Sequence, residues 1–499
     1  MRRRTLFPAS LVLLACLAQP ATAQQVPDQL TLADAIELAR QNNPGYQAVR
    51  NDIEVADWNV RAAWGALAPS ASLGGNVGWR GAGEQNFGGI TASELGVTNQ
   101  PNYYSSGYNA SVNWGLSGQN WYGPQSARAG RAITASQIDA ARLNLETQVT
   151  RLYLDVLRQR EGVTLATQQL ERAQFNFRIA EAQAEVGSGT LLDVRQSAVQ
   201  VGRSEVAVLQ SQNALATARL RLMQQLGVSL NQEPALVSAF ELQQPDFEFE
   251  ALYDEAVQQN PTLDTRRNTV TSNRVGVKIA KSSYLPSLSF STGLSGFARE
   301  ASDVGPLIAQ AQASVASQQR SCQSTNELYS RLANPFPALD CTKIVFTDAQ
   351  RDAIVSSNNA FPFDFTRSPP SATLSISIPV FQGLSRQQRL ESAGAQLRDA
   401  EFQVREQELA LEADLSVNLA LVETAFRSAE IERRNQQYAD EQLRLATERY
   451  QLGGLPFLDL VDAETVKAQA DRDLLNAVYA YHDAITNLEA VVGRPLRNR

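Results

Sequence analysis

The feature that most constrains this chain is a proline-free run from Leu384 to Leu452, whose only glycine is Gly394. The run is rich in Ala, Leu, Glu, Gln and Arg, which are strong helix formers. Its apolar residues recur every seven positions, the spacing that keeps one seam of a long helix against a neighbour: Leu390, Leu397, Val404 and Leu411. At ~1.5 Å per residue, one helix of this length would measure roughly 100 Å.

A glycine-rich turn ends this run and is expected to reverse the direction of the chain. Gly453-Gly454-Leu455-Pro456 breaks the pattern, and a second proline-free run continues from Phe457 to about Val492. We therefore expect a long helical hairpin over residues 384–493. An earlier pair of runs has the same plan, with its break at Gly187-Ser188-Gly189, and predicts a second long hairpin over residues 120–227.

The two hairpins belong to an internal repeat. A shift of 266 positions superimposes Leu145 on Leu411, Gly187 on Gly453, Leu192-Asp193 on Leu458-Asp459 and Gly227 on Gly493. Upstream, a shift of 217 superimposes Asn43-Pro44 on Asn260-Pro261, Arg50-Asn51 on Arg267-Asn268 and Pro69-Ser70 on Pro286-Ser287. The shifts differ by 49 residues, so the second copy carries an insertion of that size. We predict a tandem duplication with repeats over 24–245 and 246–499.

Each repeat also contains two stretches in which apolar residues alternate with Ser, Asn and Gly. They follow predicted helices over 30–68 and 252–284, and we expect strands over 70–80, 108–116, 286–296 and 372–381. Each strand has about 9–11 residues, the length that crosses a bilayer when tilted. A half-buried hairpin in a soluble sheet is the alternative for any one pair. The joining stretch over 297–371 is expected to be an enlarged external loop.

The N-terminus has the features of an export signal. Met1-Arg2-Arg3-Arg4, an apolar core over 11–15 and Ala21-Thr22-Ala23 predict a signal peptide over residues 1–23. A lipid-bearing Cys16 after Leu13-Leu14-Ala15 is the competing interpretation. In an exported protein Cys322 and Cys341 can form a disulfide, and two unpaired thiols remain the alternative. With a net charge of −8 and no later basic block, the sequence argues against a nucleic-acid partner.

Four strands are too few to close a barrel, since the smallest transmembrane barrels have about eight. An open sheet edge cannot face lipid either, because its N–H and C=O groups would find no partner there. Several chains must then share one barrel, and three would supply twelve strands. The predicted fold class is mostly α with a small β part: tandem-duplicated long α-hairpins plus four transmembrane β-strands per chain, which contribute to a barrel shared between chains.

With these features the chain resembles the TolC family of outer-membrane efflux proteins, also called outer membrane factors. The resemblance rests on the duplicated Asn-Pro helices, the Pro-Ser strand starts, Leu-Ser-Ile-Ser-Ile-Pro-Val-Phe at 374–381, Arg449-Tyr450-Gln451-Leu452-Gly453 and Leu458-Asp459. It implies a homotrimer with a twelve-stranded barrel in outer-membrane lipid and an α-barrel in the periplasm. It also implies a passive exit duct, coupled through a periplasmic adaptor (membrane fusion) protein to an inner-membrane RND, ABC or MFS transporter. Small molecules and, as in type I secretion, unfolded protein are the cargo classes that it leaves open.

The resemblance also implies a periplasmic gate. It matches Asp459 and Asp462, which lie three residues apart on one helix face, with an aspartate constriction. It matches Asp193 with the acidic position at the tip of the other hairpin and Tyr450 with the tyrosine that helps hold the hairpins together, although Leu455 and Leu192 depart from the family pattern. The alternative is that these acids only favour a helix N-terminus. The resemblance further implies that the turn residues contact the adaptor, while turn formation alone is the simpler role: Gly187, Ser188, Gly453 and Gly454.

Catalytic material is scarce in this sequence. His482 is the only histidine, and we expect it in an interfacial or solvent-facing position on a helix. Phosphate-binding loops, metal-ligand spacings and nucleophile motifs are missing, so we predict neither an enzyme nor a cofactor. The rival function is a secreted trimeric coiled-coil scaffold or surface fibre without a conduit, which accounts poorly for the four strands.

Overall fold

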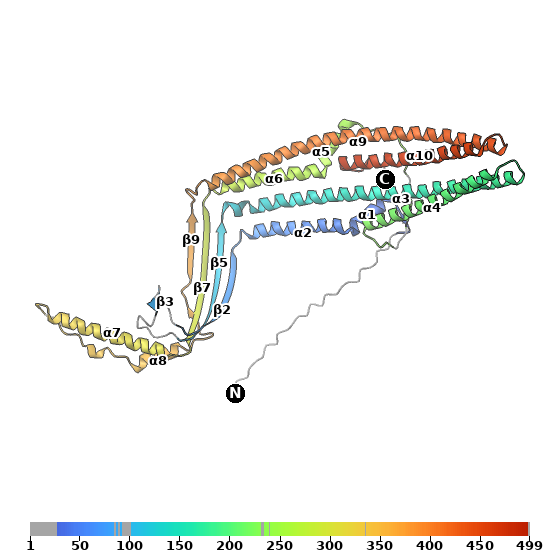
Figure 1. Cartoon of the computed structure of the whole chain (residues 1–499). Coiled ribbons are helices and arrows are strands. Elements are labelled where there is room, and N and C mark those ends of the chain that lie inside the picture. The colour runs from blue at the N-terminus through green and yellow to red at the C-terminus, as the bar shows by residue number, and fades with distance from the viewer. Residues whose placement is uncertain are drawn as a thin grey trace. The chain divides into compact units, whose positions relative to one another are not determined.

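The computed structural model describes residues 27–83, 86–87, 90–91, 101–230, 234–238, 240–334 and 336–497. The expected signal peptide over 1–23, with Cys16, lies outside the described residues. The chain is mostly helical and has one small antiparallel sheet, which confirms the predicted class (Figure 1). It divides into a helical unit, with residues up to 59, 127–274 and from 394 on, and a sheet unit, with residues 60–126 and 275–393.

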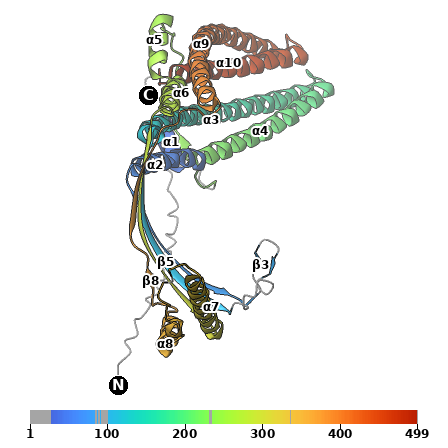
Figure 2. The same cartoon turned by 90° about the vertical axis from the view of Figure 1, so that its left-hand side faces the viewer.

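Two long hairpins make up most of the helical unit. The first consists of α3 (Gly118–Glu185) and α4 (Leu191–Leu226), and the second of α9 (Ser385–Gln451) and α10 (Phe457–Val492). The helices of each hairpin run side by side in both views (Figures 1 and 2). The first residues of α3 and α9 belong to the sheet unit.

Shorter helices precede each sheet segment of the chain. They are α1 (Leu32–Asn42) and α2 (Pro44–Gly65) in the first repeat, and α5 (Phe249–Gln259) and α6 (Pro261–Ser282) in the second. Asn43 and Asn260 separate the members of each pair, with extended ψ angles of 116° and 114°. A residue before proline is pushed out of the helical region, and proline readily starts the next helix. The repeated Asn-Pro dipeptide therefore makes two helices where one would otherwise continue.

The duplication extends to the hydrophobic cores of the helical unit. One cluster buries Val149, Val156 and Leu222, and the other buries Leu415, Val422 and Leu488, which are the same positions shifted by 266. Helices α1 and α5 contribute at the other shift, with Ala35 in the first cluster and Leu252 in the second. A fully buried Val or Leu contributes about 1.5–3 kcal/mol, so equivalent positions stabilise both halves.

The sheet unit has four main antiparallel strands: β2 (Ser70–Arg80), β5 (Tyr103–Leu116), β7 (Ser287–Ala301) and β9 (Ser371–Ser377). They lie side by side in the order β2, β5, β7, β9 (Figure 1), and the two-residue strand β8 (Thr366–Arg367) also pairs with β7. The described residues also form two minor pairs, β3 (Asn86–Phe87) with β4 (Ile90–Thr91) and, in the helical unit, β1 (Gln29–Leu30) with β6 (Ala235–Leu236).

Three strand boundaries differ from those expected over 108–116, 286–296 and 372–381. Strand β5 begins five residues earlier, at Tyr103, and β7 continues to Ala301, because these outer residues pair with each other. Strand β9 ends at Ser377, whereas residues up to 381 were expected to continue it. Pro379 has no N–H to donate to the ladder, so the alternating pattern of residues 378–380 does not extend the strand.

The stretch over 297–371, expected as an enlarged loop, contains two helices. They are α7 (Gly305–Ser330) and α8 (Asp348–Ser357), with a short 3₁₀ helix, η1 (Cys341–Lys343), between them. Thr347 and Gln350 form a capping box at the start of α8. The sulfur atoms of Cys322 and Cys341 are bonded at 2.00 Å and connect α7 with η1. Within the described part of the chain, no helix combines the length and apolar character needed to cross a membrane.

Candidate functional site at the hairpin turns and the sheet

The turn at the end of each long hairpin has the same backbone structure. Gly187 and Gly453 have φ angles of 77° and 71°, in the left-handed region that favours glycine. The N–H of Ser188 donates to the carbonyl oxygen of Gln183, and the N–H of Gly454 donates to that of Arg449, both at 2.9 Å. These bonds are the hallmark of the Schellman motif that ends many helices. The two turns are therefore equivalent in structure as well as in sequence.

Both turns expose apolar side chains at equivalent positions. Val186 and Leu452, which precede the glycines, are exposed, and so are Leu192 and Leu458 on the returning helices. Ser188, Gly453 and Gly454 are exposed as well. Formation of the turns does not by itself require these four side chains to be apolar and to face solvent.

Asp193 lies at the start of α4 and is engaged in a capping box. The backbone N–H and the hydroxyl of Thr190 both donate to Asp193 Oδ2, at 3.0 and 2.7 Å, and the Asp193 N–H donates back to Thr190 Oγ1 at 3.2 Å. This arrangement satisfies two N–H groups that a helix start leaves unpaired. The carboxylate of Asp193 thus has a structural role in addition to any role in a gate.

Asp459 holds the equivalent position at the start of α10, but its surroundings differ. Its N-cap residue is Pro456, which makes no side-chain capping bond and has no N–H to donate to the carboxylate. Asp459 and Asp462 are both exposed, and their spacing places them on one face of the helix. The structure therefore presents these two carboxylates to solvent, whereas Asp193 is held by Thr190.

Tyr450 is buried where the two hairpins meet. Its ring packs against Phe457, with centroids 5.8 Å apart, and its carbonyl oxygen accepts a hydrogen bond from Gln183 Nε2 at 3.3 Å. Burial, and then the negative charge of Asp193, raise the pKa of the Tyr450 hydroxyl. The charge of Asp193 thus acts on the Tyr450 hydroxyl. Leu455 packs against the apolar cluster that contains Tyr450, Phe457 and Leu460. The hydrogen bond from Gln183 to Tyr450 joins the end of α9 to the end of α3.

A buried ion cluster, which we did not expect from the sequence, also connects the hairpins. Lys467 on α10 is only 4% exposed, and its Nζ lies 2.7 Å from Asp471 Oδ1 and 3.3 Å from Asp440 on α9. Gln436 donates to the same Asp471 oxygen at 3.0 Å, and Arg172 on α3 lies 3.9 Å from the other. The sequence did contain a signal, because Lys467 follows Leu460 by seven residues and so occupies the apolar seam.

Close to this cluster, Asn176 on α3 donates a hydrogen bond to Glu464 on α10. Burial raises the pKa of the Glu464 carboxyl, while the positive charge of Arg172 and the bond from Asn176 act in the opposite direction. Polar contacts between α3 and α10 therefore extend along the hairpins from the ion cluster toward the turns.

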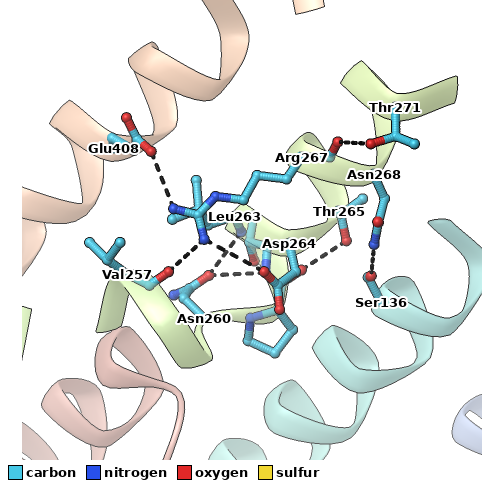
Figure 3. A network of polar contacts seen from close by, with 12 residues as sticks. Ser136, Val257, Asn260, Leu263, Asp264, Thr265, Arg267, Asn268, Thr271 and Glu408 are labelled. Atoms are coloured by element: carbon cyan, nitrogen blue, oxygen red, sulfur yellow. Dashed lines mark hydrogen bonds and ion pairs between the residues drawn. The ribbon is translucent and has the colours of Figure 1, made fainter. Parts of the chain in front are cut away.

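A second polar network holds the repeated Asn-Pro joint of the second half (Figure 3). Arg267 on α6 donates to the carbonyl oxygen of Val257 at 2.7 Å and to Glu408 on α9 at 3.3 Å. The next residue, Asn268, donates to Ser136 Oγ on α3 at 2.6 Å. One turn of α6 therefore contacts α5, α9 and α3. The contacts come from Arg267 and Asn268, the pair that the sequence repeat aligns with Arg50 and Asn51.

His482, expected at an interface or facing solvent, is buried. It is 2% exposed, and its ring lies 5.3 Å from that of Phe240 and 5.2 Å from that of Tyr481. The aromatic linker after α4 covers this face of α10, which helical periodicity alone did not indicate. Burial, assisted by the positive charge of Arg497, lowers the pKa of His482 to about 4.

The sheet has one apolar and one polar face. Residues paired across antiparallel strands point to the same side, so the register assigns each side chain to a face. One face carries Leu73, Val77, Trp79, Tyr104, Tyr108, Ala110, Phe290, Leu294, Leu374 and Ile376. The other carries mainly Ser, Asn, Thr and Gly, with Phe297, Tyr103 and Ala301 as exceptions. Apolar-face side chains are largely exposed, and Leu73 reaches 81%. Exposure of these apolar side chains to water is unfavourable, so this face of the sheet is suited to an apolar environment.

Comparison with known proteins agrees with this geometry. The sequence model of the family described as "Outer membrane efflux protein" matches residues 35–228 and 306–494. The pyoverdine export outer membrane protein OpmQ of Pseudomonas putida is 26% identical over 341 residues, which are 60% of this chain and 69% of that relative. The solved structure of CusC is 17% identical with a TM-score of 0.67, over 93% of this chain and 92% of that one. The outer membrane protein VceC of Vibrio cholerae is 16% identical with a TM-score of 0.65, over 93% and 97%.

Proposed function

The chain belongs to the outer membrane efflux protein family, and we propose that three copies form the passive exit duct of a tripartite export system. As a member of this family it is an outer-membrane efflux channel of an export system. The proposal adds the homotrimer, a shared twelve-stranded barrel, a gate at the hairpin turns and an adaptor that connects the duct to an inner-membrane transporter.

The observation that carries the proposal is the open sheet of a single chain. Within the described residues β2 pairs only with β5, and β9 pairs only with β7, so both outer strands have an unpaired edge. An unpaired edge is not tolerated in lipid, where its backbone groups have no hydrogen-bonding partner. Three copies that join edge to edge would satisfy every strand, with the apolar face toward lipid and the polar face toward a water-filled pore.

The aromatic residues of the apolar face support this placement. Tyr104 on β5 pairs with Trp79, and ten residues further along the same strand Trp114 pairs with Phe290. Ten strand residues span about 33 Å, which a tilt of roughly 40° reduces to a height of about 25 Å. That is the height of the apolar band of outer-membrane barrels, which aromatic residues border at both interfaces.

At the hairpin turns, we assign Asp459 and Asp462 to the gate. Three copies of two exposed carboxylates near a common axis would repel one another and attract cations. Tyr450 supports the gate indirectly, because its carbonyl oxygen accepts a hydrogen bond from Gln183 and so joins the two hairpins within one chain. Asp193 is assigned to the gate through its negative charge, which acts on the Tyr450 hydroxyl. The exposed apolar pairs, Val186 with Leu452 and Leu192 with Leu458, are the surface we assign to the adaptor.

Single-channel conductance in planar bilayers tests the gate. The double variant Asp459→Ala/Asp462→Ala should conduct more than the wild type and lose its block by divalent cations. A matched control removes two exposed acids from α9, Asp399→Ala/Glu401→Ala, and should leave both properties unchanged. Unchanged conductance and unchanged cation block in the gate variant would exclude these aspartates as the constriction.

The proposed duct indicates only the general class of the cargo and of the partner transporter. A relative named for pyoverdine export makes a secreted small compound the first cargo to test, and unfolded protein is the second. Cells in which this protein has been deleted are compared with the same cells after it is expressed again. The cargo class whose export returns identifies the substrate. The rival function, a scaffold without a conduit, predicts that the reconstituted protein gives no channels at all.

A further inference from the structure

The insertion of the second repeat returns to the sheet through an aromatic segment, Phe361-Pro362-Phe363-Asp364-Phe365, which we call the FPFDF segment. It is fixed at both ends. Before it, Asn358 exchanges two hydrogen bonds with the backbone of Ala301, at 2.7 and 2.8 Å, at the outer end of β7. After it, Ser368 donates its N–H to the carbonyl oxygen of Ser295 at 2.8 Å.

Between these two points the segment lies on the apolar face of the sheet. The ring of Phe361 lies 5.6 Å from that of Tyr104, and the ring of Phe365 lies 5.0 Å from that of Tyr108. Between the two tyrosines, Ser106 donates its hydroxyl to the carbonyl oxygen of Pro362 at 2.6 Å. Tyr104, Ser106 and Tyr108 alternate along β5 and therefore share one face, which is the face that carries Leu73 and Val77.

The burial pattern agrees with this position. Ser106 and its paired neighbour Ala298 on β7 are 4% and 2% exposed, although most of the same face is open. Phe363, in the middle of the segment, contacts Phe365 at 6.5 Å between centroids but remains 81% exposed. The segment thus covers a small part of the apolar face of the sheet. Its own exposed side chain, Phe363, extends the apolar surface that the uncovered part of the sheet presents.

We propose that the FPFDF segment is a lipid-interface anchor, which holds the insertion against the membrane side of the barrel wall. The inference rests on the proposed function, because that function assigns lipid to the apolar face. Exposed charges at Asp364 and Arg367 follow Phe363 in the chain and set its depth, since ionised side chains avoid the hydrocarbon and remain near the headgroups. Phe363 then belongs to the outer aromatic border together with Trp79 and Tyr104.

This arrangement indicates which face of the sheet the returning end of the insertion contacts. An insertion that capped the pore mouth would return over the polar face of the sheet, toward the lumen. Here the returning arm contacts the opposite face. The occupant of the surface around Phe363 is therefore outer-leaflet lipid.

Site-directed fluorescence in reconstituted vesicles tests the anchor. Phe363→Cys, Phe336→Cys and Leu73→Cys are each labelled with an environment-sensitive maleimide dye, and the unsubstituted protein gives the background. Phe336 is the matched control, because it is an exposed phenylalanine of the same insertion outside the segment. The quenchers are aqueous iodide, a lipid with a nitroxide near its headgroup, and a lipid with a nitroxide deep in its acyl chain.

The dye at residue 363 should emit at shorter wavelength than that at residue 336, and the headgroup-level nitroxide should quench it several-fold more than iodide. Iodide quenching at 363 as strong as at 336, together with lipid quenching at Leu73, would overturn the anchor and leave the proposed function intact. Protection of residue 363 from all three quenchers would place it against protein and would also overturn the anchor. If Leu73 escapes both lipid quenchers, the membrane position of the sheet is wrong, and the proposed function fails as well.

Discussion

The side-chain amide of Asn260 donates a hydrogen bond to the carbonyl oxygen of Val491, 2.9 Å away. The first repeat contains the same bond, from Asn43 to the carbonyl oxygen of Gln225 at 2.8 Å. Donors and acceptors are related by the two shifts of the sequence repeat, 217 and 266. The asparagine that separates two short helices therefore also fixes the end of the returning long helix, once in each half.

Removal of this amide should destabilise the joint. Asn260→Asp keeps the oxygen that accepts from the Thr262 and Leu263 N–H groups but loses the donor to Val491. We expect a loss of about 1–3 kcal/mol in the free energy of unfolding, because a buried carbonyl group is left unpaired. Denaturant unfolding followed by circular dichroism measures it. Asn43→Asp should act in the same direction, and two variants as stable as the wild type would contradict the role of this bond.

Glycine is required at the residue that ends each returning helix. Gly227 has a φ of 71°, and a Cβ there would lie 2.3 Å from the carbonyl oxygen of Asn42. Gly227→Ala should therefore lower the unfolding free energy by more than the ~1–2 kcal/mol of the left-handed backbone alone. Gly202→Ala, within the same helix and with open space around it, is the control and should stabilise the helix by about 0.5–1 kcal/mol. Equal thermal midpoints for the two variants would contradict this account.

The buried ion cluster should behave as a coupled pair. Lys467→Met leaves Asp471 buried without its closest cation and should cost about 3–5 kcal/mol. The double variant Lys467→Met/Asp471→Leu removes both charges and should recover most of that loss. A double-mutant cycle on thermal or denaturant unfolding measures the coupling. Additive effects of the two substitutions would show that the ion pair contributes no coupling energy.

His482 should make the stability of the helical unit depend on pH. Its pKa is lowered to about 4 in the folded chain, against about 6.5 when unfolded. The unfolded state therefore takes up the proton first, and stability falls as the pH decreases from about 6.5 toward 4. Between about pH 7 and pH 5 this one group should cost about 2 kcal/mol. His482→Phe, measured alongside the wild type, should lose less stability over that interval, and identical losses would refute the assignment.

Much of the fold followed from the sequence because it is repeated. The shifts that align Asn43 with Asn260 and Gly187 with Gly453 also align buried Val149 with Leu415 and the two Schellman turns. Long helices have strong local signals, and the alternation around Leu73 and Leu374 marked the strands. The capping box of Thr190 with Asp193 corresponds to a Thr-x-x-Asp pattern in the sequence.

Other features depend on contacts that no local pattern contains. The bond from Gln183 to Tyr450 joins residues 267 positions apart. His482 is buried because Phe240, on a linker without periodicity, covers it. The helices of the insertion lack a repeated partner for comparison, and Pro379 ended a strand whose alternating pattern continued past it. The face on which the FPFDF segment lies depends on the register of β5, which the sequence alone does not set.

The native mass of the detergent-extracted protein tests the central claim most directly. If one chain supplies an open sheet whose edges must be joined in lipid, the protein in the particle should have three times the mass of one chain. It should also keep that mass on dilution, because separation would expose unpaired strand edges. A stable monomer, or a dimer, that remains folded in detergent would contradict the shared wall on which the proposed duct depends.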